Sequence, residues 1–345
     1  MDLPDVFEVV TIEVLIVCSE RIEMLNRAVK SIFSAAAGVQ QVSVKIRILL
    51  NAPMKLTEQS PSVSQLTAND RVELIWHHGD RLKPGDARNL LIQNLQAPWA
   101  FFIDDDAFPR KDLFLNFLEI LKKKPELVLL GGPNLTPKES NPIQLMTGAV
   151  LESFWGTLHS QARYFPTGEV RAAKEAYLSS CNLFVRQDIL RANPYPEHYR
   201  TAEEAYFLSK VITLYPDQCF YDPNLVVYHH RRGDWMSFAK QVFGYANGRG
   251  QMVSEGLIES PWHFVPSAGL VSFVILGPFA FARPYVLSAF LFYSTATFWF
   301  ASELCRKLQR PDRFFAATLA YVVLHLSYAL GFLAGVSRHF ILAIK

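Results

Sequence analysis

Three consecutive carboxylates, Asp104, Asp105 and Asp106, directly follow the apolar run from Phe101 to Ile103. A short apolar run of this kind predicts a buried strand, so the acids are expected at its carboxyl end. Adjacent carboxylates repel one another and raise each other's pKa unless a cation lies between them. In an extended segment Asp104 and Asp106 point to the same side. Two such carboxylates suit a hard divalent ion, Mg²⁺ or Mn²⁺, that also binds a diphosphate; the alternative is a solvated acidic turn.

A second acidic feature, Glu203-Glu204, opens the segment 202–214, whose apolar spacing predicts a helix. One carboxylate within hydrogen-bond reach of a hydroxyl can serve as a general base, and an adjacent acid can raise its pKa. Acids also stabilise the first turn of a helix through its dipole, so a solvated helix start is the alternative.

Basic residues occur at two further places. Arg88 lies in the first turn of a helix predicted over 86–96, where the helix dipole and the guanidinium both suit an anionic ligand. The run 228–232 contains His229, His230, Arg231 and Arg232. A histidine there could be a third metal ligand or contact a diphosphate, and the arginines could neutralise phosphate. Because a helix with amphipathic spacing follows over 235–246, binding of this patch to anionic lipid headgroups is the alternative, as is a plain surface.

The elements that must position these residues alternate between strands and helices. Short apolar runs predict strands over 12–17, 42–50, 72–76, 99–103 and 127–130, and apolar residues at helical spacing predict helices over 22–36, 86–96 and 113–123. Helices over 188–192 and a strand over 225–228 follow in a more irregular region. Alternation of this kind predicts an α/β domain with a mostly parallel sheet and helices on both faces, which binds ligands at the carboxyl ends of its strands.

Composition restricts the class of protein. The chain has 345 residues and a formal net charge of only +2, so we expect no nucleic-acid partner. Its four cysteines lie far apart without CxxC spacing, which argues against a zinc site and against a disulfide framework. The start, Met1 to Val10, lacks the pattern of a signal peptide, so the first domain is expected in the cytoplasm.

Charge nearly disappears after residue 260, and three stretches could cross a bilayer: 264–282, 284–302 and 314–337. The loop 303–313 carries four arginines and lysines and should face the cytoplasm, as should the first domain. We therefore expect a multi-pass protein of the cell (cytoplasmic) membrane that contacts membrane lipids. The alternative is a buried, all-helical core.

Four motifs in order resemble the family 2 inverting glycosyltransferases with the GT-A fold. They are Ala87-Arg88-Asn89, the acidic triplet, Glu203-Glu204 followed by Phe207 and Lys210, and a strand Ser180-Cys181-Asn182-Leu183-Phe184-Val185-Arg186. The resemblance covers roughly residues 10–250. The tail from Tyr228 to Arg232, with Trp235 and a helix reaching Gly248-Arg249, resembles the succinoglycan-type polysaccharide transferases that carry a carboxy-terminal membrane part.

The resemblance implies a role for each residue. The metal ligands would be Asp104 and Asp106, with His230 as a candidate third, on the diphosphate of the donor. Glu204 would be the general base, supported by Glu203. The implied substrate-binding residues are Arg88, Asn89, Asn51, Asp104, Asn182, Arg231 and Arg232.

The chain also departs from the family pattern. Asn51 stands where relatives commonly have an Asp that reads the base, which leaves uridine, guanosine and thymidine donors open. Cys18 to Arg21 occupies the place of a Pro-x-Tyr-Asn segment, so the stacking aromatic is missing. The Gln-x-x-Arg-Trp signature of processive synthases is absent, which favours transfer of a single sugar.

We therefore predict a GT-A catalytic domain over 1–232, an amphipathic membrane-surface helix and connector over 233–260, and transmembrane segments over 261–345. The expected reaction moves a sugar, with anomeric inversion, from a nucleotide-diphosphate donor to a hydroxyl of a lipid-linked or membrane-proximal glycan. The alternatives are a polyprenyl-phosphate glycosyltransferase and a non-catalytic nucleotide-binding membrane scaffold.

Overall fold

The computed structural model describes residues 9–19, 21–51, 60–258, 260–279 and 281–343, with side chains through Ser337. These residues form two compact units. The first unit comprises the described parts of Met1–Leu135 and Ala162–His230, and the second comprises those of Thr136–Gln161 and Arg231–Lys345.

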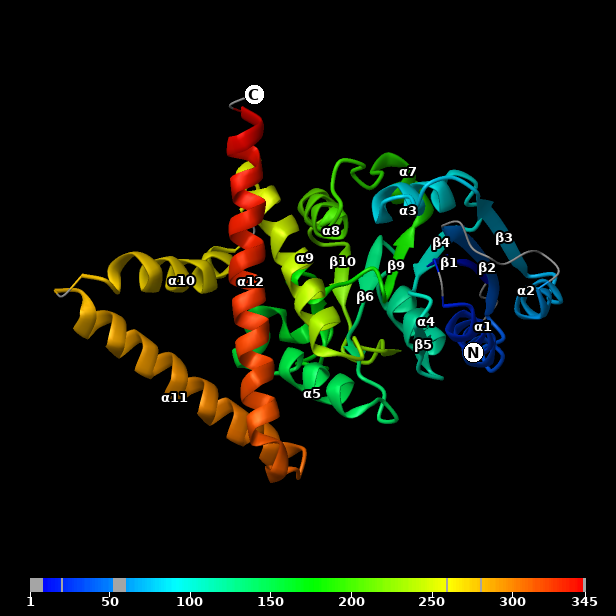
Figure 1. The fold of residues 1–345 in the computed structure, drawn as a ribbon. Helices are drawn as coiled ribbons and strands as arrows, with labels where there is room; N and C mark the ends of the chain where they lie inside the picture. The colour runs from blue at the N-terminus through cyan, green and yellow to red at the C-terminus, as the bar shows by residue number, and fades with distance from the viewer. Residues whose placement is uncertain (1–8, 20, 52–59, 259, 280, 344–345) are drawn as a thin grey trace. The chain divides into compact units, whose positions relative to one another are not determined.

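The first unit is built on an eight-stranded sheet with the strand order β3-β2-β1-β4-β9-β6-β10-β8. Its strands are β1 (Val10–Cys18), β2 (Val42–Asn51), β3 (Val72–His77), β4 (Trp99–Phe102), β6 (Leu129–Gly131), β8 (Arg171–Ala172), β9 (Leu183–Arg186) and β10 (Cys219–Tyr221). Figure 1 shows β3, β2, β1 and β4 side by side. These four strands are parallel, whereas β9 runs antiparallel to both β4 and β6. The prediction of a mostly parallel sheet is confirmed.

Helices cover both faces of this sheet and give it two hydrophobic cores. Residues Ile12, Val14 and Ile16 of β1 belong to the core that includes α1 (Ile22–Ala36) and α4 (Leu113–Lys123), whereas Leu15 belongs to the core on the other face. Successive side chains of a strand point to opposite faces, so a strand apolar at nearly every position is buried on both. The helices of the second face are α3 (Pro84–Gln93), α7 (Gln187–Ala192) and α8 (Glu203–Leu214); α2 (Pro61–Thr67) packs beside α1, and η2 spans Glu175–Tyr177.

Stacked phenylalanines lock the register between β4 and β9. Phe101 of β4 and Phe184 of β9 are register partners, and their ring centroids lie 4.2 Å apart. Phe117 of α4 stacks on Phe184 at the same centroid distance. Aromatic cross-strand pairs stabilise a sheet beyond the apolar area they bury. This stack therefore determines which residues just beyond the two strands face each other.

A small second sheet, with the order β5-β11-β7, follows the acidic triplet. It comprises β5 (Ala107–Pro109), β7 (Asn134–Leu135) and β11 (Val227–His229). β11 runs antiparallel to β5 and places His229 opposite Ala107. The residues after the triplet thus bring the histidines of the tail back to it.

Most of the elements predicted for the first unit are confirmed within a few residues. The predicted helices over 22–36 and 113–123 are α1 and α4 with identical bounds. The sequence patterns did not predict the short strands β5, β7, β8 and β10, because none of them lies in an apolar run of four or more residues.

The second unit consists of helices, including two from the middle of the chain. They are α5 (Pro142–Leu151), α6 (Phe154–Thr157), α9 (Trp235–Ser254), α10 (Val265–Leu276), α11 (Arg283–Lys307) and α12 (Phe314–Ala343), with the 3-10 turns Leu158–Arg163 (η1), Pro261–Phe264 (η3) and Pro311–Arg313 (η4). The helix predicted over 235–246 extends to Ser254 as α9.

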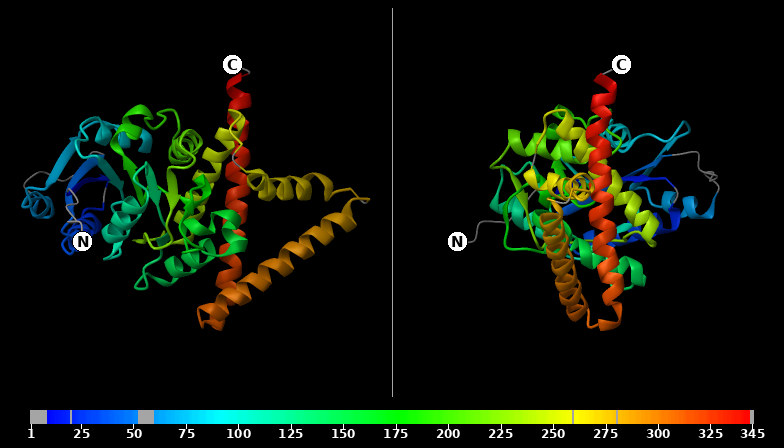
Figure 2. Two further views of the ribbon diagram at one scale, coloured as in Figure 1. Left: turned by 180° about the vertical axis from the view of Figure 1, so that it is seen from behind. Right: turned by 60° about the vertical axis from the view of Figure 1, so that its left-hand side comes forward.

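Glycines let α9 and α12 pack backbone against backbone, and the two helices cross in both views of Figure 2. A Cβ atom on Gly331 would lie 2.3 Å from the carbonyl oxygen of Phe243, and one on Gly335 would lie 2.1 Å from that of Asn247. Small residues spaced by four allow such close approach between apolar helices.

The expectation of three transmembrane segments is not confirmed. Among the described residues, one helix, Pro311–Ser337, is long and apolar enough to cross a bilayer, judged by length and composition. The stretch predicted over 264–282 forms the shorter α10, which ends at Leu276. The stretch predicted over 284–302 lies within α11, where polar residues such as Ser294, Thr295 and Thr297 interrupt the apolar ones.

Removing the central aromatic ring tests the importance of the stack for the first unit. We expect Phe184→Ala to destabilise the protein by about 3–5 kcal/mol, because it deletes a buried ring and leaves a cavity. The matched control is Phe165→Ala, since Phe165 is 47% exposed and belongs to the same unit. Thermal melting of the detergent-solubilised full chain measures both. Equal melting temperatures for the two variants would contradict the importance of the phenylalanine stack for the first unit.

Candidate active site

The acidic triplet lies just beyond the carboxyl end of β4, as predicted. The side chain of Asp104 is 41% exposed, whereas those of Asp105 and Asp106 are 3% and 4% exposed. The imidazole of His229 contacts the two alternate members: its Nε2 lies 3.7 Å from Asp104 Oδ2 and 3.1 Å from Asp106 Oδ1. Asp104 and Asp106 therefore do face a common side.

Arg21 supplies the nearest positive charge to the triplet. Its guanidinium donates one hydrogen bond to Asp105 and another to Asp106. Burial nevertheless raises the pKa of Asp105 to about 6; Arg21 opposes the shift, while the neighbouring carboxylates add to it. Cys18, at the end of β1, donates its thiol to Asp105, and burial raises the pKa of this thiol. The triplet is thus a buried concentration of negative charge that Arg21 compensates in part.

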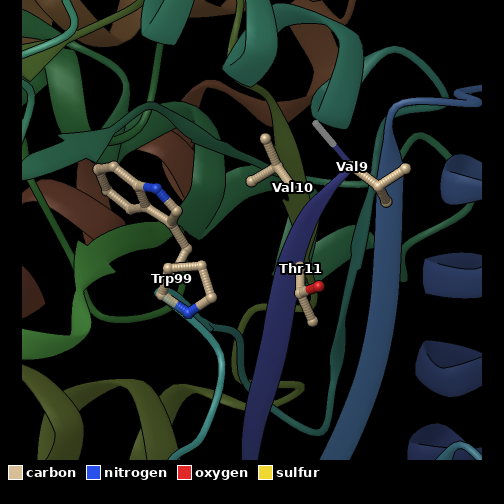
Figure 3. A pocket seen from close by; sticks show the side chains of 5 residues that line it. Val9, Val10, Thr11 and Trp99 are labelled. Carbon is tan, nitrogen blue, oxygen red and sulfur yellow. The ribbon is translucent and has the colours of Figure 1, made fainter. Parts of the chain in front are cut away.

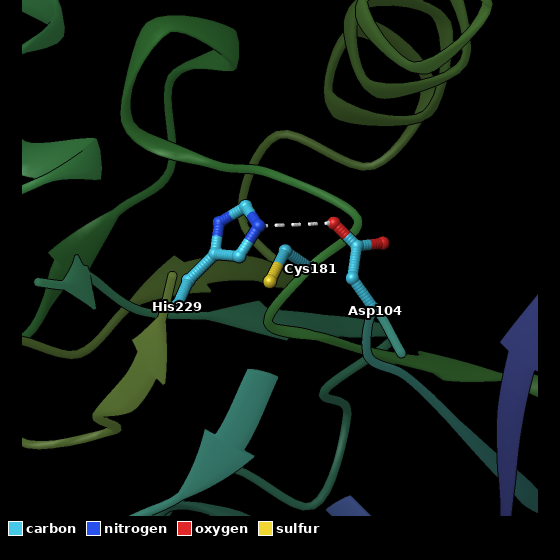
Figure 4. Close-up of side chains that lie close together, drawn as sticks. All are labelled: Asp104, Cys181 and His229. Atoms are coloured by element: carbon cyan, nitrogen blue, oxygen red, sulfur yellow. Dashed lines mark ion pairs between the residues drawn. The ribbon is translucent and has the colours of Figure 1, made fainter. Parts of the chain in front are cut away.

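Cys181 lies across from Asp104 because of the register between β4 and β9. Phe102 pairs with Leu183, so continuing the antiparallel register by two residues places Asp104 opposite Cys181. Ligand atoms of Asp104, Cys181 and His229 all lie within 4.8 Å of one another, and Figure 4 shows the three side chains turned toward one another. Carboxylate, thiol and imidazole are all metal-binding groups, so this set fits a divalent cation.

The two glutamates predicted to act in catalysis begin α8. The residue before them, Ala202, has φ of 78° in the left-handed region, which a residue with a Cβ rarely adopts. Such backbone strain persists only where surrounding contacts impose it, and it clusters at functional sites. Here it sets the direction in which Glu203 and Glu204 leave the turn.

Glu204 is held by backbone and arginine. Its Oε2 accepts a hydrogen bond of 2.8 Å from the backbone N–H of Ser180, and its Oε1 lies 3.7 Å from Arg163 Nη1. Burial raises the pKa of Glu204, Arg163 and Arg88 oppose this shift, and the charge of Glu203 adds to it. A carboxylate with a raised pKa accepts a proton more readily, as a general base must.

Glu203 pairs with Arg88, the arginine for which a phosphate or ribose contact was predicted. Arg88 Nη1 lies 2.6 Å from Glu203 Oε1, and its guanidinium also lies over the ring of Tyr195. Burial disfavours the charged guanidinium, but Glu203, Tyr195, Glu204 and Asp104 together outweigh this and raise the pKa of Arg88. The pair joins α3 to the first turn of α8.

Three asparagines for which donor contacts were predicted each bind backbone. Asn51 exchanges two hydrogen bonds with the backbone of Leu82, and Asn89 exchanges two with that of Tyr195. Asn182 is fully buried and donates to the carbonyl oxygens of Pro133 and Leu225. All three hold loops at the carboxyl edge of the sheet, and their predicted contacts with the donor stay predictions.

The histidines and arginines of the run 228–232 do not gather at one place. Although His230 was the predicted third metal ligand, the structure places His229 at the acids, while the His230 ring lies 3.3 Å from Arg27 Nη1. Arg231 and Arg232 belong to the second unit. There Arg231 is buried and donates to Thr136, and Arg232 is exposed.

Sequence patterns did not assign site roles to Arg21, Cys181 or Arg163. The sequence could have indicated a site role for Arg21, because it follows β1, β1 neighbours β4, and the ends of adjacent parallel strands meet at one edge of the sheet. No local sequence pattern could have indicated a site role for Cys181 or Arg163. Cys181 reaches the site through the antiparallel register of β9, and Arg163 reaches it through an irregular segment.

A shallow pocket at the other end of the strands is lined by Val9, Val10, Thr11, Pro98 and Trp99 (Figure 3). It lies at the beginnings of β1 and β4 and contains no acidic or basic side chain. It is therefore separate from the candidate site.

Comparisons with known proteins agree with this arrangement. The family model described as Glycosyl transferase family 2 matches residues 14–192. A mannosyltransferase from Pyrobaculum calidifontis, solved with GDP-Man and Mn²⁺, has a TM-score of 0.56 at 13% identity, with 93% of this chain and 86% of that chain covered. TarS 1–349 from S. aureus, solved with UDP-GlcNAc, has a TM-score of 0.49 at 12% identity over 94% and 91% of the two chains. No match was found among curated protein sequences.

The sheet with acids at its carboxyl edge and glutamates at the start of α8 has the GT-A fold, as the likeness in fold indicates. The chain belongs to glycosyl transferase family 2.

Replacing Arg21 tests its role as counter-charge. In a chelator, we expect Arg21→Gln to lower the stability by roughly 1–2 kcal/mol, because Asp105 and Asp106 lose their cation and remain buried. Manganese should restore more stability to this variant than to the wild type, since the ion would no longer compete with the guanidinium. Melting curves with and without Mn²⁺ measure this. Arg186→Gln is the control, because it removes an exposed pair with Asp188; an equal response in both variants would contradict the role.

Proposed function

We propose that this protein transfers a single sugar from a nucleotide diphosphate to a hydroxyl of a lipid-linked or membrane-proximal glycan, inverting the anomeric carbon. One observation carries the proposal. Ser180 donates its backbone N–H to Glu204, while the adjacent Cys181 lies beside Asp104 and His229. A partly buried carboxylate base and a cluster that can hold a cation therefore flank one turn, as a single displacement at a diphosphate-linked carbon requires.

In this mechanism Glu204 accepts the proton of the acceptor hydroxyl as that oxygen attacks the anomeric carbon. The bond from that carbon to the diphosphate oxygen breaks, and its electron pair remains on the leaving diphosphate. Attack from the opposite side inverts the anomer in one step. A divalent ion held by Asp104 and Asp106 would offset the charge of the leaving group.

The arginines around the glutamates tune the base. Arg163 and Arg88 oppose the rise that burial causes in the pKa of Glu204. The backbone N–H of Ser180 fixes one carboxylate oxygen, so the other can face an acceptor. Arg88 pairs with Glu203 and thereby positions the start of α8. In this role it is not a guanidinium free to contact phosphate.

The mannosyltransferase similar in fold was solved with GDP-Man and Mn²⁺, so these are the donor and ion to test first. Uridine and thymidine donors belong in the same screen, because Asn51 stands where relatives carry an acid.

Membrane association is part of the proposal and is supported by large apolar side chains that are exposed on the second unit. They lie on or next to α10, α11 and α12 and include Phe273, Val274, Ile275, Phe281, Tyr285, Phe292, Trp299 and Phe315. Exposed apolar surface of this extent is typical of contact with lipid or protein. We propose lipid, because α12 forms most of the candidate span and the segment before it, from the last turn of α11 to η4, carries Arg306, Lys307, Arg310 and Arg313.

Asp106→Asn should abolish sugar transfer while the protein still folds, because the amide retains the shape of the carboxylate but not its charge. A radiolabelled-donor assay in Mn²⁺ measures transfer, and Asp188→Asn, at an exposed ion pair, is the control. Full activity of Asp106→Asn, or of the wild type in excess chelator, would refute the metal part of the proposal.

Glu204→Gln should lower kcat by about 10²–10⁴-fold, the usual contribution of a general base. In the wild type, kcat/KM should fall as the pH falls through the raised pKa of Glu204, because the protonated acid cannot accept a proton. This acidic limb should lie above the ordinary glutamate value and disappear in the variant. A mild loss in Glu204→Gln would instead indicate a phosphate acceptor, which needs no base.

A further inference from the structure

Asp104, Cys181 and His229 come from three separate segments and converge at the acidic end of β4 (Figure 4). We propose that they form a cation site with one oxygen, one sulfur and one nitrogen ligand, which prefers Zn²⁺, Co²⁺ and Mn²⁺ to Mg²⁺. The inference rests on the metal site of the proposed function. It keeps Asp104 as a ligand, assigns Cys181 and His229 in place of Asp106, which binds Arg21, and states which ion the site prefers.

The convergence follows from strand pairing. The β4–β9 register places Cys181 opposite Asp104, and the stack of Phe101 on Phe184 holds that register. The pairing of His229 with Ala107 brings the imidazole to the same place from the small sheet. Side chains that met by chance on surface loops would not be held in place by two sheets.

Burial gives the site a closed and an open side. Cys181 is 2% exposed, and the side chain of His229 is 15% exposed, whereas that of Asp104 is 41% exposed. Three protein ligands with an accessible fourth position are typical of catalytic rather than structural metal sites. Arg21 occupies the Asp105–Asp106 side, so the open position is next to Asp104, where diphosphate oxygens could complete the coordination.

Sulfur and nitrogen ligands decide which ion binds. Mg²⁺ prefers oxygen ligands and octahedral geometry, whereas thiolate and imidazole suit Zn²⁺ and Co²⁺. A purely oxygen-ligated site at Asp104 and Asp106 would bind Mg²⁺ and leave Cys181 uninvolved. When the proposed site is filled, the thiol of Cys181 loses its proton to solvent and the sulfur binds the ion.

The spacing of the cysteines in the sequence argued against zinc because it lacks CxxC pairs. That argument excludes a structural site with several cysteines. It does not exclude a site with one cysteine, whose other ligands come from other strands.

The test is a Co²⁺ titration of the nucleotide-free full chain in detergent, followed by absorption in the near ultraviolet. We expect the wild type to develop a thiolate-to-cobalt charge-transfer band, and Cys181→Ser to lack it. Competition with a zinc dye should show that Cys181→Ser weakens Zn²⁺ binding at least about tenfold. Mg²⁺ binding should change much less.

Two matched controls assign the band. Cys219→Ser removes another buried thiol of the same unit and should keep the band. Cys18→Ser removes the thiol next to Asp105 and should keep it too. If Cys181→Ser fails to fold, His229→Asn provides the second variant and should shift the band and weaken Zn²⁺ binding.

The outcomes separate this inference from the proposed function. Cobalt bound without a charge-transfer band, or a band lost in Cys18→Ser and kept in Cys181→Ser, overturns the sulfur ligand and leaves a metal site of carboxylates. No binding of any divalent ion, with or without nucleotide, overturns both.

Discussion

The antiparallel pairing of β9 with β4 is the constraint on which the candidate site depends. It carries the turn Ser180–Asn182 to the same sheet edge as the acidic triplet. Ser180 then binds Glu204, Cys181 faces Asp104, and Asn182 binds the backbone of the segments that lead into the small sheet. A strand parallel to β4 would place this turn at the other end of the sheet. The base and the cation-binding cluster are therefore neighbours because one strand runs against its neighbours.

The site also concentrates negative charge, and an arginine lies near each group of acids and partly neutralises it. Arg21 contacts the triplet, Arg88 contacts Glu203, and Arg163 lies near Glu204. Compensation is incomplete, since burial still raises the pKa values of Asp105 and Glu204. An unbalanced cluster of carboxylates attracts a further cation, and a carboxylate with a raised pKa is a better base. The same electrostatic imbalance thus supports both parts of the proposed chemistry.

In the second unit, apolar helices pack against one another through small residues. Gly331 and Gly335 allow the backbone of α12 to touch that of α9, while the outer faces of α10 and α11 leave large apolar side chains exposed. Hydropathy alone predicted three spans, because it counts apolar residues without regard to where helices end. The break after Leu276 and the polar residues of α11 leave one candidate span in the described chain.

The sequence by itself determined the longer strands and helices of the first unit, the position of the acids beyond β4 and the start of α8, because periodicity and strand-end rules are local. It also indicated the family, through four motifs in order. Only the tertiary structure decided which polar residues meet. It brought His229 rather than His230 to the acids, turned Asn51 and Asn89 toward backbone, and placed Arg21 and Cys181 in the site. These contacts depend on register between strands distant in the chain, and no local pattern encodes that register.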